Sequence, residues 1–313
     1  MVKIGFIGCH IISWHCLQKI CNLSKKFNDE IKLVYNLESN EAEKHSGSID
    51  FDSLQKQFSF DLKYVVNVSD SKNIEYMKNA NLDILFIIGW HRIVPQEVLD
   101  TAKFCLGIHS SVLPKDRGPS PINWQLIKGD KEGGVTLFHL ATGVDSGPIV
   151  DSKGYEISNE DDVNTVYSKA IIASIEMLEN NWSDIHNLVP KTLLQNESLA
   201  TFNERRKPND GLIDCTKDSK SCFNFIRALT IPYPGAFSFL NKQKIMIWKS
   251  KISNEKETTP GKIIECEDSI KVSTGNGCIE LISLQVENEP ICDAKLFLKS
   301  YQIKYGDMFK TTI

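Results

Sequence analysis

Residues 82–88, LDILFII, form an apolar run in which only Asp83 is polar. The run is too short for a membrane helix, and its Ile, Leu and Phe content is typical of a strand buried on both faces of a parallel sheet. In open α/β sheets, ligands bind in the crevice outside the carboxyl ends of the strands. We therefore expect the residues after this strand, together with the polar block around His109, to line a functional site.

The N-terminal part of the chain predicts strands that alternate with helices, beginning with a βαβ unit. Strands are expected at 2–8, 31–37, 64–68, 82–88, 134–141 and 148–157, and helices at 11–23, from 74 on, and at about 161–178. This order predicts a Rossmann-like α/β domain with a mostly parallel sheet. The domain is expected over residues 1–203, with the polar segment 183–202 as a connector.

The pattern changes from residue 204 onward. One helix at 219–228 precedes short β-type runs at 237–240, 245–248, 262–265, 270–273 and 279–286. Closely spaced short strands of this kind favour a small antiparallel barrel or sandwich. We therefore predict a smaller β-rich, OB-like C-terminal domain over residues 204–313.

Composition excludes several classes of protein. The chain of 313 residues is 41% hydrophobic, and its start has no signal-peptide pattern, so we expect a cytoplasmic globular protein that does not associate with membranes. The formal net charge of −4 disfavours nucleic acid as a partner. The nine cysteines are scattered without a CxxC pair, which indicates neither disulfides nor a metal site. A homodimer is left open.

The block at 107–150 carries groups suited to acyl transfer. The imidazole of His109 can donate a hydrogen bond to an oxygen that becomes negative, and the carboxylate of Asp145 can orient that imidazole and help remove a proton. A structural histidine and a turn aspartate would also explain these two residues. The first βα turn lacks GxGxxG, so it does not indicate a dinucleotide site.

Several segments resemble the folate-dependent formyltransferases, the family of the methionyl-tRNA, glycinamide ribonucleotide and sugar N-formyltransferases. The matching segments of the polar block are HSSVLP (109–114), RGPSP (117–121), NW (123–124), GVT (134–136) and GVDSG (143–147). Further along, RKP (206–208), DGLID (210–214) and IRALTIPYPGAF (226–237) look most like the members that act on nucleotide-linked amino sugars. The resemblance covers nearly the whole chain.

The resemblance implies roles for individual residues. It makes His109 and Asp145 the catalytic pair and gives 10-formyltetrahydrofolate as the formyl donor. The folate is expected between the loops at 88–94 and 142–145. The residues expected to contact it are Ile88, Trp90, Arg92, Ile93, Thr142 and Val144. The residues expected to contact the second substrate are His91, Arg117, Ser120 and Asn123. His10 and Ser13 are added to them because the first βα turn can contact a phosphate or nucleotide.

The expected acceptor is the primary amine of a dideoxyamino sugar linked to dTDP, UDP or GDP, as in the synthesis of O-antigen and lipopolysaccharide sugars. A methionyl-tRNA formyltransferase is one alternative. A folate or sugar-nucleotide binding module that has lost catalysis is another, because the family has an asparagine two residues before the histidine and this chain has Gly107. We expect a water or another side chain, such as His91 or Asn123, to occupy the space of that asparagine, so that Gly107→Asn brings no gain.

Overall fold

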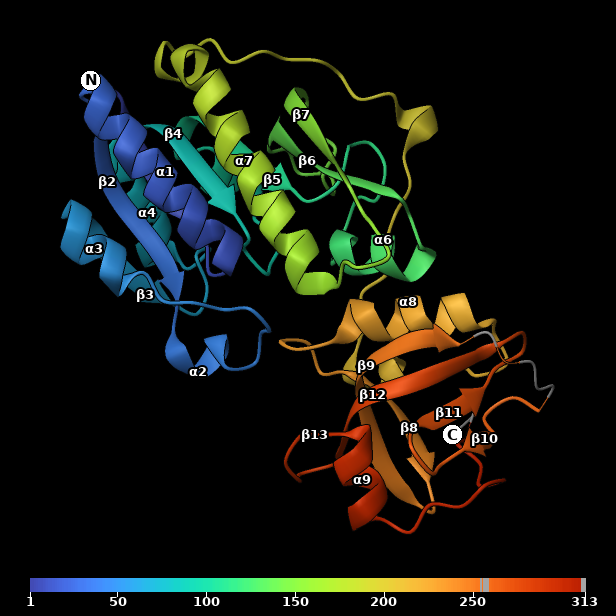
Figure 1. The fold of residues 1–313 in the computed structure, drawn as a ribbon. Helices are drawn as coiled ribbons and strands as arrows, with labels where there is room; N and C mark the ends of the chain where they lie inside the picture. Colours follow the sequence, from blue (N-terminus) through green and yellow to red (C-terminus); the bar gives the residue numbers. More distant parts are fainter. Residues whose placement is uncertain (254, 256–258, 311–313) are drawn as a thin grey trace. The chain divides into compact units, whose positions relative to one another are not determined.

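The computed structural model describes residues 1–253, 255 and 259–310, which form two compact units (Figure 1). Unit 1 contains residues 1–121, 132–156 and 167–204, and unit 2 contains residues 122–131, 157–166 and those from 205 on. The last segment of unit 2 starts close to the boundary predicted at 203/204. The two short segments at 122–131 and 157–166 were not expected in the second unit. The limits 1–203 and 204–313 remain proposed domain limits.

Unit 1 is built on a seven-stranded sheet with the order β3-β2-β1-β4-β5-β6-β7. Its strands are β1 (Lys3–Ile7), β2 (Glu30–Leu37), β3 (Asp61–Val65), β4 (Leu82–Ile88), β5 (Ala102–His109), β6 (Glu132–His139) and β7 (Ile149–Glu156). The first five strands of this order are parallel, whereas β6 and β7 are antiparallel to their neighbours. The prediction of a Rossmann-like, mostly parallel sheet is confirmed. The strand order reverses between β1 and β4, as at the ligand-binding switch point of such sheets.

Helices cover both faces of this sheet. The helices of unit 1 are α1 (Ile11–Phe27), α2 (Ser39–Ala42), α3 (Asp52–Phe58), α4 (Ser71–Ala80), α5 (Gln96–Leu99) and α7 (Val163–His186). The helix α6 (Pro121–Lys128) belongs to unit 2 except for its first residue. The helices α1 and α7 lie side by side on one face (Figure 1), where Lys19 pairs with Glu179 at 2.7 Å. The buried side chains of α4 and α5 pack on the opposite face, into the core around Leu85 and Ile87. No helix of the described segments is long and apolar enough to cross a bilayer.

The sequence analysis treated residues 89–133 as loop and therefore missed three elements, α5, β5 and α6. The residues Ala102–His109 form β5, paired in parallel with β4, and Pro121–Lys128 form α6. His109 therefore stands at the end of its own strand and not in a loop that leaves β4. The pairing of Ile88 with Ile108 brings the carboxyl ends of the two strands together.

Unit 2 contains an antiparallel curled sheet with the order β10-β11-β12-β9-β8, and β13 pairs with β12. Its strands are β8 (Ala236–Leu240), β9 (Gln243–Ser253), β10 (Ile263–Glu265), β11 (Ile270–Ser273), β12 (Cys278–Val286) and β13 (Cys292–Asp293). The helices are α8 (Ser219–Leu229), which packs on β9, and α9 (Ala294–Ser300), which packs on β12. The predicted β-rich C-terminal fold is confirmed, whereas α9 was not predicted.

The early segment 122–131 belongs to unit 2 because of specific contacts. Asn123 donates its side-chain amide to the carbonyl of Ala228 at 2.7 Å. The Arg206 guanidinium lies over two aromatic rings, 5.3 Å from the centroid of Trp124 and 5.2 Å from that of Phe225. A guanidinium at these distances gains cation–π attraction from each ring, so these contacts hold the segment in place.

Candidate active site

His109 and Asp145 lie together although 35 residues separate them in sequence. The Nδ1 atom of His109 is 3.6 Å from the Asp145 carboxylate. This separation is longer than the hydrogen bond of about 2.6 to 3.2 Å expected for such a pair. Both side chains are mostly buried, with 11% of His109 and 23% of Asp145 exposed. The structure therefore brings the two predicted catalytic groups into one site, at ion-pair distance.

Backbone groups fix the orientation of this pair. The Nε2 atom of His109 is 2.7 Å from the carbonyl oxygen of Asp116, and Gly118 donates its N–H to the Asp145 carboxylate at 2.7 Å. Because a carbonyl only accepts hydrogen bonds, Nε2 carries a proton in this arrangement, and Nδ1 faces the carboxylate. A second proton on the imidazole would lie between Nδ1 and Asp145. The geometry thus provides one hydrogen-bond donor and one place to hold a proton.

The space beside Gly107 is filled by an apolar side chain. A Cβ atom on residue 107 would lie 2.8 Å from Cδ2 of Leu140 and 3.2 Å from the carbonyl oxygen of Ile87. Leu140 follows β6, and its N–H donates to the carbonyl of Cys105 at 2.8 Å. The side chain nearest to this position is therefore Leu140, and not His91 or Asn123 as expected.

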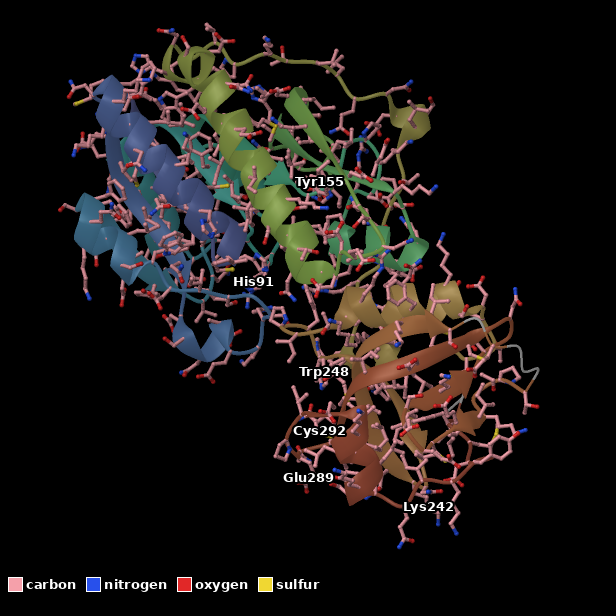
Figure 2. The ribbon with its side chains drawn as sticks, in the orientation of Figure 1. His91, Tyr155, Lys242, Trp248, Glu289 and Cys292 are labelled. Atoms are coloured by element: carbon pink, nitrogen blue, oxygen red, sulfur yellow. The ribbon has the colours of Figure 1, made fainter. Side chains whose placement is uncertain are left out.

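The loop after β4 carries most of the residues expected to contact folate. Ile88 is buried at the end of the strand, and Trp90 is half-buried against the core. Arg92 donates to Nε2 of the adjacent His91 at 2.9 Å, and the His91 ring packs against His45 at 4.2 Å (His91 is labelled in Figure 2).

The apolar and polar side chains at the tips of the two predicted folate loops are open to solvent. Ile93 is 79% exposed and Val144 is 44% exposed, and Thr142 is exposed beside it. The contacts of these residues with folate remain a prediction.

The first βα turn is closed by its own hydrogen bonds. Ser13 is fully buried, donates to the carbonyl of Ile88 at 2.6 Å and accepts from the backbone of His10 at 3.1 Å. His10 caps α1 and packs on Tyr167 at 5.0 Å. Burial lowers the pKa of His10 from 6.5 to about 4, so the ring is neutral at pH 7. A substrate contact by His10 would therefore be a hydrogen bond to a neutral ring.

The second predicted group of substrate residues surrounds the loop before α6. Arg117 is 2% exposed and binds the Glu197 carboxylate through Nη1 at 2.8 Å and Nη2 at 2.7 Å. Ser120 has a left-handed backbone, with φ of 55°. The Oδ1 atom of Asn123 is buried and has no hydrogen-bond partner among the described residues. The proposed substrate contacts of these three residues remain untested.

Two polar residues of the connector were missed by the sequence analysis. Gln195 and Glu197 both bind the Arg117 guanidinium. They stand in an irregular polar stretch, 78 and 80 positions from Arg117. Neither hydrophobic periodicity nor a local motif marks such a contact, so no signal in the sequence could have found it.

Comparisons with known proteins agree with this architecture. The family model for formyl transferase matches residues 13–179, and the model for the formyl transferase C-terminal domain matches residues 205–302. The bifunctional polymyxin resistance protein ArnA of Wigglesworthia glossinidia brevipalpis is 36% identical over 223 residues, which is 71% of this chain and 34% of that protein. The chain thus spans about a third of the length of that relative.

Two further relatives cover more of their own length. The methionyl-tRNA formyltransferase of Citrifermentans bemidjiense is 30% identical over 247 residues, 78% of this chain and 76% of that protein. The N-formyltransferase of Helicobacter canadensis, solved with folinic acid and dTDP-3-aminofucose, shares the fold with a TM-score of 0.68. It is 21% identical and covers 90% of this chain and 99% of that chain. On the match of both family models and of a relative along most of its length, this chain belongs to the formyl transferase family.

Proposed function

We propose that this formyltransferase moves the formyl group of 10-formyltetrahydrofolate to the primary amine of a nucleotide-linked dideoxyamino sugar, as in the synthesis of O-antigen sugars. The observation that carries the chemistry is the His109 and Asp145 pair, 3.6 Å apart, at the edge where β5 ends. In an α/β sheet, this edge is where substrates bind.

The proposed reaction needs an oxyanion donor and a route for one proton. The amine nitrogen attacks the formyl carbon, and the carbonyl oxygen becomes negative as the new C–N bond forms. In this structure the Nε2–H of His109 donates to the Asp116 carbonyl. During the reaction it would donate instead to the oxygen that becomes negative. As the bond from the formyl carbon to the folate nitrogen breaks, the proton lost by the amine passes to that nitrogen, with Asp145 and His109 holding it on the way.

The loops at 88–94 and 142–145 are the proposed folate site. Their exposed apolar side chains, Ile93 and Val144, suit a flat ring system. The indole N–H of Trp90 is buried and has no hydrogen-bond partner within the described part of the chain. An unpaired buried donor is unfavourable, and a ligand acceptor at this loop would satisfy it.

Two acceptors compete under this proposal. The sugar nucleotide is supported by the IRALTIPYPGAF segment at 226–237, by the net charge of −4, and by the dTDP-3-aminofucose bound in the Helicobacter neighbour. The initiator methionyl-tRNA is supported by the relatives that are 30% identical to this chain and carry that activity in their names. A polyanion such as tRNA usually requires a basic surface, so we favour the sugar.

One assay distinguishes these acceptors. The protein is incubated with 10-formyltetrahydrofolate and a panel of amino sugars linked to dTDP, UDP or GDP, and each sugar is examined by mass spectrometry for the addition of CO, since CHO replaces H. A parallel reaction contains methionyl-tRNA. Formylation of at least one sugar is expected. Formylation of the tRNA alone would overturn the proposal, and no product from any acceptor would favour a module that has lost catalysis.

A further inference from the structure

The connector after α7 runs along the loop that follows His109. Thr201 donates its N–H to the carbonyl of Pro114 at 3.2 Å and accepts the N–H of Arg117 at 2.9 Å. Asn203 donates to the carbonyl of Arg117 at 2.8 Å, and the Thr201 hydroxyl accepts the N–H of Asp116 at 2.8 Å. The connector therefore holds the backbone of this loop on both sides of Asp116, whose carbonyl contacts His109.

A single side chain of the connector joins this loop to the loop of Asp145. The Nε2 atom of Gln195 donates to the carbonyls of Asp145 at 2.8 Å and Gly147 at 2.7 Å. Its Oε1 atom accepts from Nε and Nη2 of Arg117, at 3.2 and 2.7 Å. The Gln195 amide thus uses both of its N–H hydrogens on the loop of Asp145 and its oxygen on the loop of Arg117.

The backbone of Asp145 has a conformation that surrounding contacts stabilise. Its φ is +46°, in the left-handed region. For a residue with a side chain this conformation costs about 1 to 2 kcal/mol, and it persists where surrounding contacts fix it. The Gln195 amide fixes the carbonyl of Asp145, and the N–H of Gly118 fixes its carboxylate. Because Gly118 follows Arg117, the contacts form a closed ring from Gln195 through Arg117, Gly118 and Asp145.

The need to neutralise the charge of Arg117 does not by itself explain the contacts of Gln195. Glu197 already neutralises the guanidinium through two hydrogen bonds. A side chain that bound only Arg117 would not donate two hydrogen bonds to the Asp145 loop. The side-chain NH2 group of Gln195 is therefore the part that acts on the site.

We propose that Gln195 is a positioning residue that holds the Asp145 carboxylate against His109 by way of the Asp145 and Gly147 carbonyls. This inference rests on the proposed formyl transfer, and it names a residue outside both predicted catalytic loops. It implies that changing the side-chain NH2 group of Gln195 lowers the rate of transfer and leaves substrate binding nearly unchanged.

The test replaces donors and keeps the acceptor. In Gln195→Glu, the carboxylate still accepts from Arg117 but cannot donate to the two carbonyls. We expect kcat to fall about 10-fold to 100-fold, as for a displaced catalytic group, with KM for either substrate changed less than about threefold. In Gln195→Ala, kcat should fall at least as far. In an Asp145→Asn background, the Gln195→Glu change should reduce kcat less than about twofold, since residues that act through one group are not additive.

A matched control exists in unit 2. Gln285 has the same pattern, because its Oε1 accepts from Nε1 of Trp248 at 3.0 Å and its Nε2 donates to the carbonyl of Glu289 at 2.6 Å. Trp248 and Glu289 are labelled in Figure 2. Gln285→Glu should leave kcat within about twofold of wild type. Normal kcat in Gln195→Glu, or an equal loss with and without Asp145→Asn, would overturn the proposal.

A second measurement does not depend on the acceptor. Crystal structures of the wild type and of Gln195→Glu should show Asp145 leaving the left-handed region in the variant and its carboxylate moving away from His109. Unchanged geometry in the variant would refute the positioning role. If no sugar is formylated, the function proposed above fails, and this structural comparison still decides the role of Gln195.

Discussion

Gly118 donates its backbone N–H to the Asp145 carboxylate over 2.7 Å, and this contact ties the loop after β5 to the loop after β6. The carboxylate that faces His109 is thus oriented by a main-chain group. The two side chains of the proposed catalytic pair can be tested one at a time.

The first prediction concerns the catalytic pair itself. Replacing His109 with Asn, or Asp145 with Asn, should lower turnover at least about 100-fold, because each change removes a group that holds a proton or donates to the oxyanion. Steady-state kinetics with the acceptor found in the sugar panel measure this loss. Circular dichroism melts should show that both variants remain folded. Near-normal turnover in either variant would mean that its assigned role is wrong.

The second prediction concerns Gly107, where the chain departs from the family. Gly107→Asn should be neutral or harmful, because its Cβ would press on Leu140 at 2.8 Å, and overpacking of this kind costs about 1 to 3 kcal/mol of stability. Adding Leu140→Ala makes room, so the double variant should recover stability relative to Gly107→Asn alone. Urea denaturation and kcat are measured for the wild type, for Gly107→Asn and for the double variant. A large gain in kcat for Gly107→Asn alone would favour the view that this is a weakened enzyme.

The third prediction concerns pH. His10 has a pKa of about 4 in the folded chain and 6.5 as its ordinary value, because burial disfavours the charged ring. Between these values the unfolded chain binds a proton that the folded chain does not, so stability is lost as pH falls from about 6.5 to about 4, by up to about 3 kcal/mol.

The variant His10→Asn provides the comparison for this effect. Asparagine is a good N-cap and does not titrate, so α1 stays capped. Urea denaturation at pH 7 and pH 5 should show a smaller loss of stability in the variant than in the wild type. The same loss in both proteins would assign the pH dependence to other groups.

The fourth prediction concerns the cation–π contacts of Arg206 in unit 2. Arg206→Lys should reduce the free energy of unfolding by about 1 to 2 kcal/mol, because an ammonium lacks the planar, delocalised charge that the guanidinium presents to the rings of Trp124 and Phe225. The neighbouring Arg205 is exposed and serves as the control, with Arg205→Lys expected to change stability by less than about 0.5 kcal/mol. Equal stability of both variants would argue against the cation–π contribution.

Most strands of both units could be predicted from the sequence, because apolar runs such as 82–88 and 279–286 indicate strands that are buried in a core. The sequence analysis missed β5 because Gly107 and His109 interrupt the apolar pattern at the end of Ala102–His109, next to the candidate site. The pairing of His109 with Asp145 followed from the family motif and not from any periodicity. Local conflict between pattern and structure is expected where residues are selected for function.

The contacts of the connector could not be predicted at all. A hydrogen bond between side chains 78 positions apart depends on how the whole sheet places two loops, and polar stretches carry no periodic signal. The same reason hid the packing of Leu140 beside Gly107, since only the register of β5 and β6 brings the two together.

The hydrogen bonds of Gln195, Thr201 and Asn203 set the shortest fragment that can be expected to retain the geometry of His109 and Asp145. A piece cut at residue 179, where the first family match ends, or at His186, where α7 ends, would lose every one of these bonds. A truncated protein meant for crystallisation or for fusion to another enzyme should therefore run through residue 203. A chimaera that exchanges the sheet of unit 1 between relatives should likewise include the connector through residue 203.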